Sequence, residues 1–197
     1  MKNFVLIQSN SNVQPLLEEI QRQSNPWELH TGRQNKIKVQ SEARSIPLRG
    51  IVKSKIMGRK RFDVHESRFT TLSRQFPECV AFMKAFAIER DGELSRAKLV
   101  NLPPVNRVYT HIDRGDYYKI RNRYHLVIST GQDGSYLKAG DESVRMKTGE
   151  LWWFNNKVPH ESHNDSSQDR IHLIFDLLPC SQQQSTILPL QPIKHNG

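Results

Sequence analysis

The sequence predicts a mainly β fold with flanking helices, and two observations lead to this prediction. From Lys98 to Leu178 the chain passes through short segments of alternating apolar and polar residues, which turn residues separate. No helical pattern interrupts these segments, so the strands are expected to pair in antiparallel sheets. Many short strands at this spacing are typical of a double-stranded β-helix, which is a jelly-roll, cupin-like core.

The first flanking helix is expected in residues 12–23. Apolar side chains recur there at helical spacing, and Pro15 lies in the first turn. Ser11 or Asn12 stands where a capping side chain is usual, since both can accept a hydrogen bond from a free backbone N–H.

A second helix is expected from Pro77 to about Arg90. A proline favours the first helical position, and the Asp91-Gly92 pair ends the apolar pattern. Between the two helices, residues 27–63 show short extended pieces instead of a helical pattern.

These changes in pattern divide the chain into three parts. Residues 1–92 form a mixed helix and strand part that is expected to pack on the barrel, and residues 93–179 form the double-stranded β-helix core. Residues 180–197 have the composition of a loosely held tail. At 197 residues the chain has the length of one structural domain.

The bulk composition is that of a polar globular protein. Hydrophobic residues make up 36% and charged residues 25%, and the chain lacks a run of about 18 apolar residues, so no membrane span is expected. The first apolar run is shorter than the roughly 7–15 residues of a signal-peptide core, which favours a cytoplasmic location. Cys79 and Cys180 form no CxxC pair, which argues against a disulfide framework and a thiolate zinc site.

The charge is unevenly distributed. The formal net charge is +9, and six cations lie between Arg49 and Arg61 without an acid. A basic edge strand and turn is the simplest interpretation. Nucleic acid is not favoured as a partner, because no aromatic residue is interleaved for base stacking. An acidic protein or peptide docked on this segment, or an anionic substrate passing it, is left open.

The first candidate site is the segment THID at residues 110–113. Residues two apart in a strand point to the same face, so His111 and Asp113 are expected to reach one point. A His-x-Asp pair with one distant histidine is the facial triad of non-haem iron(II) oxygenases, which leaves coordination positions open for substrate and oxygen.

The distant histidine is expected in residues 158–165, which contain His160 and His163. The two would share a face on a helix, but Pro159 and the turn residues that follow disfavour a helix. On a strand the two point to opposite faces. We therefore expect one metal ligand and one surface residue, and we choose His160 as the ligand.

Two further strands share an Arg-x-His order. Arg170 and His172 alternate with apolar residues in one strand, and Arg123 and His125 do so in the other. The apolar faces are expected to pack on helices, and the polar faces to line the open mouth of the barrel. A guanidinium there is suited to bind a carboxylate through two hydrogen bonds. We expect His172 to support the site without binding the metal.

The stretch from about Val108 to Pro179 resembles the aspartyl/asparaginyl β-hydroxylase family of iron(II)- and 2-oxoglutarate-dependent dioxygenases. The matching segments are THID, RYHLVIST, GELWWFNN, PHESHN and RIHLIFD, in this order, and they span about a third of the chain. The step from His160 to Arg170 matches the family's step from the second iron histidine to the arginine that clamps 2-oxoglutarate.

By this resemblance His111 and His160 are ligands of the catalytic iron(II). Animal peptide hydroxylases of the family have glycine two places after the first histidine, where this chain has Asp113. The chain is similar in this respect to bacterial proline hydroxylases, which have the carboxylate ligand. The implied metal site is therefore His111, Asp113 and His160.

The resemblance also implies the residues that bind the cosubstrate. Arg170 corresponds to the arginine that holds the C5 carboxylate of 2-oxoglutarate. Arg123 and His125 match an Arg-x-His motif that lies beside the cosubstrate and the substrate. Trp152 and Trp153 are adjacent in a strand and face opposite ways, so we expect at least one in the core and the other free to wall the substrate pocket.

The implied reaction is hydroxylation of an unactivated C–H bond by O2, with 2-oxoglutarate converted to succinate and CO2. The compact single domain and the Asp113 ligand favour a free amino acid, or a small molecule derived from one, as substrate. The alternative is a hydroxylase of Asp, Asn or other side chains in a peptide or protein. A further alternative is a metal-binding cupin that uses no 2-oxoglutarate. Arg170 argues against this, because such a barrel has no use for a buried guanidinium.

Overall fold

The computed structural model describes residues 2–28, 38–53, 62–131 and 135–180. Within them, every pair of neighbouring strands is antiparallel. The elements in chain order are β1 (Phe4–Gln8), α1 (Gln14–Gln21), η1 (Pro26–Glu28), η2 (Lys38–Gln40), β2 (Arg44–Lys53), β3 (Phe62–Phe69), η3 (Leu72–Gln75), α2 (Pro77–Glu89), β4 (Gly92–Leu102), β5 (Asn106–His111), α3 (Asp116–Lys119), β6 (Asn122–Ser129), β7 (Ser135–Ala139), β8 (Glu142–Val144), β9 (Leu151–Phe154), β10 (His160–Asn164) and β11 (Arg170–Pro179).

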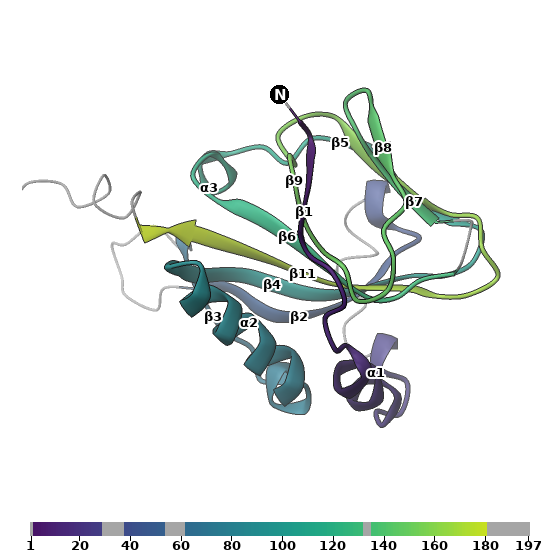
Figure 1. Cartoon of the computed structure of the whole chain (residues 1–197). Coiled ribbons are helices and arrows are strands. Elements are labelled where there is room, and N and C mark those ends of the chain that lie inside the picture. The colour runs from purple at the N-terminus through teal and green to yellow at the C-terminus, as the bar shows by residue number, and fades with distance from the viewer. Residues whose placement is uncertain (1, 29–37, 54–61, 132–134, 181–197) are drawn as a thin grey trace, which may run out of the picture.

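The strands form two sheets, as a jelly roll requires. The larger has the order β1-β9-β6-β11-β4-β2-β3, and the smaller has the order β5-β10-β7-β8. From β4 to β11 the chain passes back and forth between the sheets, so that four of these strands lie in each (Figure 1). This confirms the predicted double-stranded β-helix core.

The N-terminal part contributes strands to the larger sheet. β1 pairs with β9 at one end, and β2 joins β4 to the edge strand β3 at the other. Residues 1–92 therefore extend the same sheet that contains β4, β6, β9 and β11 of the core, in addition to supplying the helices that cover it.

The two predicted helices form. α1 begins at Gln14, later than the expected caps would place it, and Val13 at the cap position makes no side-chain bond. Oδ1 of Asn12, one of the two expected caps, accepts a hydrogen bond from the backbone N–H of Gln14 at 3.3 Å. The first turn of α2 is capped by a side chain of α1. The buried Glu19 accepts hydrogen bonds from the backbone N–H groups of Glu78 at 2.8 Å and Cys79 at 2.7 Å. A carboxylate at a helix N-terminus is favourable, because it pairs with free N–H groups and the positive end of the helix dipole.

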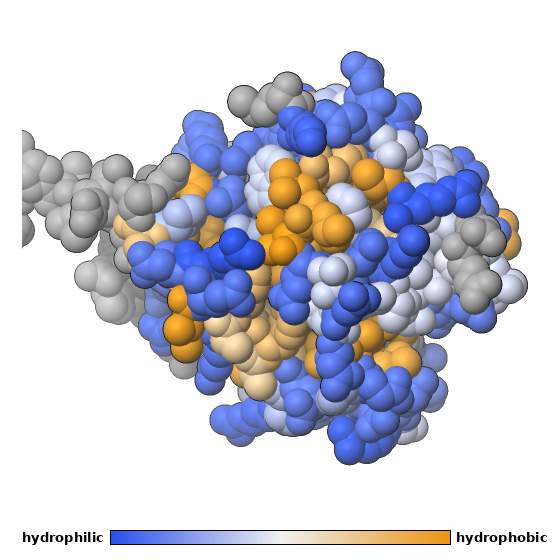
Figure 2. Space-filling model, viewed as in Figure 1, coloured by the Kyte–Doolittle hydropathy of each residue, from blue (hydrophilic) through white to orange (hydrophobic). Residues whose placement is uncertain are grey.

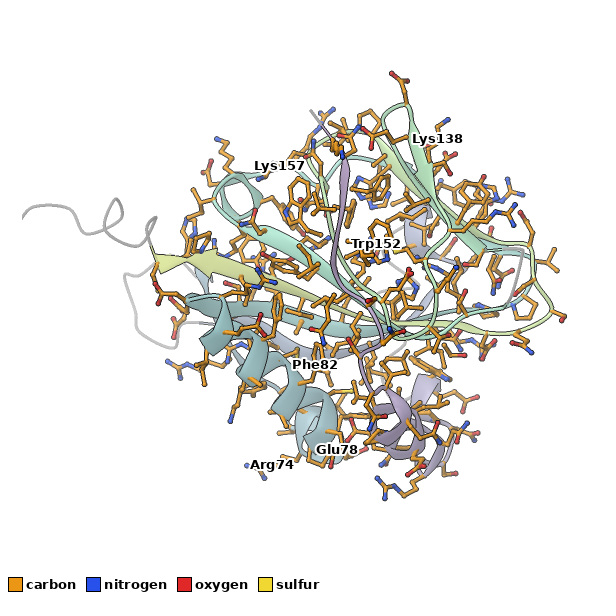
Figure 3. The ribbon with its side chains drawn as sticks, in the orientation of Figure 1. Arg74, Glu78, Phe82, Lys138, Trp152 and Lys157 are labelled. Atoms are coloured by element: carbon orange, nitrogen blue, oxygen red, sulfur yellow. The ribbon has the colours of Figure 1, made fainter. Side chains whose placement is uncertain are left out.

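Side chains alternate between the two faces of β6 and β11, so that one face belongs to the apolar core and the other to the space between the sheets. The residues that face the helices are apolar, and Leu173 and Phe175 belong to the main apolar cluster together with Met83 and Phe86 of α2. Phe82, labelled in Figure 3, lies where α2 faces the sheet, and its ring centroid is 6.3 Å from that of Phe175. The opposite faces of the two strands point between the sheets. The predicted orientation of both strands is therefore confirmed.

The outer surface is mixed in character. Figure 2 shows apolar surface gathered where β1 crosses this face, and Val5 and Leu6 of β1 are 42% and 45% exposed. None of the helices described is long and apolar enough to cross a membrane.

Two segments named in the sequence predictions lie outside the described residues: the tail from 181 onward and positions 54–61 of the basic segment. Cys79 and Cys180 are both free thiols.

Candidate active site

Two histidines face each other across neighbouring strands of the smaller sheet. His111, the last residue of β5, pairs with His160, the first residue of β10, and their ring centroids are 4.2 Å apart. Each Nδ1 lies at hydrogen-bond distance from the backbone carbonyl two residues earlier, 2.7 Å from Tyr109 and 2.9 Å from Val158. Because a carbonyl can only accept, each Nδ1 carries the proton, and both Nε2 atoms retain a lone pair for a metal.

Burial keeps His160 in the form that binds metals. Desolvation lowers the pKa of His160 from 6.5 to about 4, although the hydrogen bond to Val158 opposes the shift. The ring is therefore neutral at physiological pH, which is the state in which an imidazole nitrogen can coordinate a cation.

Asp113 completes the group. One ligand atom from each of His111, Asp113 and His160 lies within 4.8 Å of the other two, so the three residues predicted from the sequence come together. Oδ2 of Asp113 accepts hydrogen bonds from Nη1 of Arg123 and, at 2.9 Å, from Nδ2 of Asn156. Burial alone would raise the pKa of Asp113, but the Arg123 charge and the Asn156 bond outweigh it and hold that pKa below its ordinary value.

The two histidines line a cavity between the sheets. The apolar part of its wall includes Val108, Leu137, Phe154 and Ile174. The polar part, besides His111 and His160, includes three cations, one acid and one further histidine: Lys98, Arg123, Arg170, Glu161 and His125. An apolar cavity with a few converging polar groups is typical of a small-molecule site, and the cations here favour an anionic ligand.

Arg170 brings an unpaired positive charge to this cavity. The residue is 4% exposed, and burial lowers its pKa to about 10. Within the described part of the chain, no acidic group pairs with its guanidinium. A buried charge without a partner is costly, so the position is suited to an anion supplied from outside the chain.

His125 and His172 form a buried pair beside Arg170. Their Nδ1 atoms are 3.3 Å apart, and burial is the main reason that both pKa values lie well below the ordinary one. His125 lines the cavity, whereas His172 is fully buried behind it. Both rings are therefore neutral, and they add hydrogen-bonding capacity to the site without adding charge.

Arg123 also lines the cavity, but each of its three nitrogens is bound to a carboxylate. Nε donates to Oδ1 of Asp176 at 2.8 Å, Nη2 donates to Oδ2 of Asp176 at 3.0 Å, and Nη1 donates to Asp113. Tyr117 donates its hydroxyl proton to Oδ2 of Asp176 at 2.9 Å. Although burial disfavours the charged form, the two carboxylates outweigh it and raise the pKa of Arg123. Its predicted contact with the cosubstrate stays a prediction.

A second cavity of about 210 Å³ adjoins the first. The two share lining residues, among them Ser45, Lys98 and Arg123. The second is also lined by Arg49, whose guanidinium donates to Ser95 O at 2.9 Å and to Ser67 O at 2.8 Å. These acceptors are neutral, so the hydrogen bonds hold Arg49 in place without neutralising its charge, which Glu93 offsets only in part. Arg49 is thus a fixed residue of the cavity wall rather than a solvated cation.

The remaining sequence predictions concern His163 and the two adjacent tryptophans. His163, the histidine not chosen as a ligand, is stacked on Tyr136 with ring centroids 4.9 Å apart. Trp152 and Trp153 are both partly buried and pack against different apolar clusters, as adjacent strand residues must. The Asn156 contact with Asp113 was not predicted, because an Asn-Asn pair after a strand carries no pattern that identifies a partner 43 positions away.

Comparison with known proteins identifies the family. The profile of the family described as Aspartyl/Asparaginyl beta-hydroxylase matches residues 12–179, which is most of the chain. No curated protein sequence matches the chain significantly.

Solved structures of other proteins are similar in fold at low sequence identity. A prolyl-4-hydroxylase of Pseudomonas putida is 15% identical, with a TM-score of 0.52 over 90% of this chain and 92% of that chain. A prolyl hydroxylase of Trichoplax adhaerens, in complex with a peptide of hypoxia-inducible factor, is 11% identical, with a TM-score of 0.55 over 94% and 88%. HygX of Streptomyces hygroscopicus, with nickel and 2-oxoglutarate bound, is 12% identical, with a TM-score of 0.54 over 90% and 83%.

These similarities agree with the sheet order, and the family match confirms the resemblance seen in the sequence. The matched residues contain the His-Asp-His group, Arg170 and both Arg-x-His strands. The chain therefore belongs to the aspartyl/asparaginyl β-hydroxylase family.

Proposed function

We propose that the protein is an iron(II)- and 2-oxoglutarate-dependent dioxygenase that hydroxylates an unactivated C–H bond of a free amino acid or a small molecule derived from one. One observation carries the proposal. The two histidines of the His-Asp-His group and the buried guanidinium of Arg170, which no described acid pairs with, line the same cavity. A redox metal and an anionic cosubstrate therefore each have a site, and the two sites adjoin.

The donor set fits iron(II). Two neutral imidazole nitrogens from His111 and His160 and one carboxylate oxygen from Asp113 are the ligands of a facial triad, which leaves positions for a chelating cosubstrate and oxygen. Carbonyl oxygens fix both histidine rings, so no rearrangement is needed to present Nε2. The bound metal would supply oxygen activation, which the protein side chains cannot perform.

The cavity wall carries groups that would bind the cosubstrate. Arg170 would pair with the C5 carboxylate of 2-oxoglutarate, and this pairing would remove the cost of its uncompensated charge. His125, held neutral by burial, would supply a hydrogen bond nearer the metal. Leu137 and Phe154 line the cavity and limit the access of water to the reacting atoms.

The second cavity would receive the substrate. It adjoins the metal cavity through shared residues, and its wall carries Arg49, Arg96, Lys98 and Arg123 against one carboxylate, Asp176. Positively charged side chains therefore outnumber the acids among the residues of this wall. The carboxylate of a small amino acid is a matching partner, and about 210 Å³ is the space of roughly seven water molecules at about 30 Å³ each.

Hydroxylation of Asp, Asn or another side chain in a peptide or protein is the second candidate. The description of the matching family favours it, since that description names aspartyl and asparaginyl substrates. A metal-binding cupin that lacks oxygenase activity is disfavoured by Arg170, because no group of the described chain explains its burial.

Succinate release tests the proposal. The protein is incubated with iron(II), ascorbate and 2-oxoglutarate, alone and with each of the common amino acids or with Asp- and Asn-containing peptides. We expect succinate in stoichiometry with a hydroxylated free amino acid, and loss of turnover in His160→Ala. Turnover stimulated only by peptides would move the assignment to the second candidate. Failure of 2-oxoglutarate to bind the metal-loaded protein would exclude both.

A further inference from the structure

The carboxylate of Asp113 is used unequally by its neighbours. Oδ2 accepts hydrogen bonds from both Arg123 and Asn156, whereas Oδ1 accepts none from the residues that the structure describes. If Asp113 binds the metal, as the proposed function requires, Oδ1 is therefore the oxygen available to it. What keeps Oδ1 available is the way in which Arg123 is held.

Arg123 is held by the carboxylate on its far side. Asp176 on β11 pairs directly with Arg123 on β6 in the strand register, and it binds Nε and Nη2 at 2.8 and 3.0 Å. This is the two-pronged arrangement in which a guanidinium and a carboxylate fit best. Only Nη1 is then directed at Asp113, and it reaches a single oxygen.

The three side chains of this arrangement are almost entirely shielded from water. The side chains of Arg123 and Asp113 are 12% and 10% exposed, and that of Asp176 is 2% exposed. Water can therefore compete only weakly for the guanidinium. Without Asp176, Arg123 would turn to the other carboxylate within reach, Asp113, and bind both of its oxygens. A carboxylate bound in this way shares both oxygens with the guanidinium, so each is a weaker ligand for a metal.

We propose that Asp176 is a positioning residue for the metal centre, which holds Arg123 in an orientation that leaves Oδ1 of Asp113 open to the metal. Tyr117 supports it by donating a hydrogen bond to Oδ2 of Asp176 at 2.9 Å, while the Tyr117 oxygen accepts the backbone N–H of Arg96 at 2.8 Å. The polar chain thus runs from the backbone of β4 through Tyr117, Asp176 and Arg123 to Asp113.

This role differs from a simple electrostatic one, and a double-mutant cycle separates the two. An Asp176 that acted only by its negative charge would favour a cation to the same degree whether or not Arg123 is present. An Asp176 that acts by holding Arg123 has no effect once the guanidinium is gone. The comparison is therefore of Asp176→Asn in the parent protein with Asp176→Asn in an Arg123→Gln background.

The measurement is cobalt(II) and manganese(II) affinity by calorimetry, with the cobalt(II) absorption spectrum as a report on the ligand set. We expect Asp176→Asn to weaken metal binding by roughly 10–100-fold, the usual effect of losing a residue that orients a metal ligand. The same change in the Arg123→Gln background should have little effect. Tyr117→Phe, which keeps all charges, should cause a smaller loss in the same direction.

Two results would overturn the proposal. One is unchanged metal affinity in Asp176→Asn, and the other is an equal loss in both backgrounds. Circular dichroism of each variant tests whether it is folded, and the Tyr117→Phe comparison remains valid if Asp176→Asn is not. The proposed function is tested separately by the parent protein and His160→Ala. If the parent binds no metal, or if His160→Ala binds it as well as the parent does, the metal site itself is misassigned.

Discussion

His111 and His160 lie opposite each other where β5 pairs with β10. Both rings are oriented in the same way, by a hydrogen bond from Nδ1 to the backbone carbonyl two residues earlier. This arrangement aims both Nε2 atoms at the point that a carboxylate oxygen of Asp113 also reaches. The predictions below follow from this centre and from the charges around it.

Loss of any one predicted ligand should remove most metal binding and turnover. A three-ligand site has no spare donor, so we expect this of His111→Ala, Asp113→Ala and His160→Ala alike. His163→Ala is the matched control from the same strand, because His163 is stacked on Tyr136 and stands outside the group. Calorimetric titration with manganese(II) measures the effect. A protein that binds metal normally without His160, but not without His163, would show that the wrong histidine has been assigned.

Arg170→Lys should weaken 2-oxoglutarate binding while it leaves metal binding intact. The lysine keeps the charge but lacks the planar pair of N–H groups, and the expected loss is about 1.5–3 kcal/mol, the range for a charge-assisted hydrogen bond. Titration of the manganese-loaded protein with 2-oxoglutarate measures it. Arg170→Ala should lose more, and an Arg170→Ala variant that binds 2-oxoglutarate as the parent does would exclude the clamp.

Charge reversal in the basic segment should have little effect on a small substrate. We expect the triple change of Arg59, Lys60 and Arg61 to Glu to leave turnover of a free amino acid nearly constant, because a small substrate enclosed near the metal would depend on a few groups of the cavity wall. An acidic protein substrate would instead associate more slowly and show a steep dependence on salt. Turnover measured between low and high salt, with circular dichroism as the check on folding, distinguishes the two. A several-fold loss in the triple variant would favour a protein substrate.

The metal-free protein should lose stability as the pH falls below about 6.5. Burial lowers the pKa of His160 to about 4 and puts those of His125 and His172 well below the ordinary value. The unfolded chain therefore takes up protons that the folded chain does not, and the free energy of unfolding decreases towards acid. Each such histidine contributes up to about 1.4 kcal/mol per pH unit.

Urea unfolding of the metal-free protein between pH 7.5 and 5 measures this dependence. His172→Gln is the informative variant, because it removes one buried titrating ring that does not line the metal cavity. Its stability should fall less steeply with decreasing pH than that of the parent. Equal slopes in the two proteins would mean that His172 is protonated in the folded state.

Alternation and spacing in the sequence determined the β core and identified the three candidate metal ligands. The strand expected through THID is shorter than predicted, because β5 ends at His111 and Asp113 lies beyond it. A tertiary contact, the backbone hydrogen bond from Asp113 N–H to Asn156 O at 3.2 Å, helps to hold Asp113 beside the two histidines. Alternation likewise separated the helix-facing from the inward-facing residues of β6 and β11, because the side-chain period of a strand is fixed by its backbone geometry. The choice of His160 over His163 rested more on the family resemblance than on the residues around it.

Only the tertiary structure decided what each inward-facing side chain binds. The sequence places Arg123 and Arg170 in equivalent Arg-x-His patterns, yet one is held by two carboxylates and the other by none of the described groups. The difference arises from strand register. The pairing of β6 with β11 puts Asp176 beside Arg123, while Arg170 lies opposite Leu102 of β4 and has no ion pair with an acid of the described residues. β6 and β11 are distant in the chain and share no turn, so alternation within each strand fixes which face a residue is on but not which residue lies opposite it.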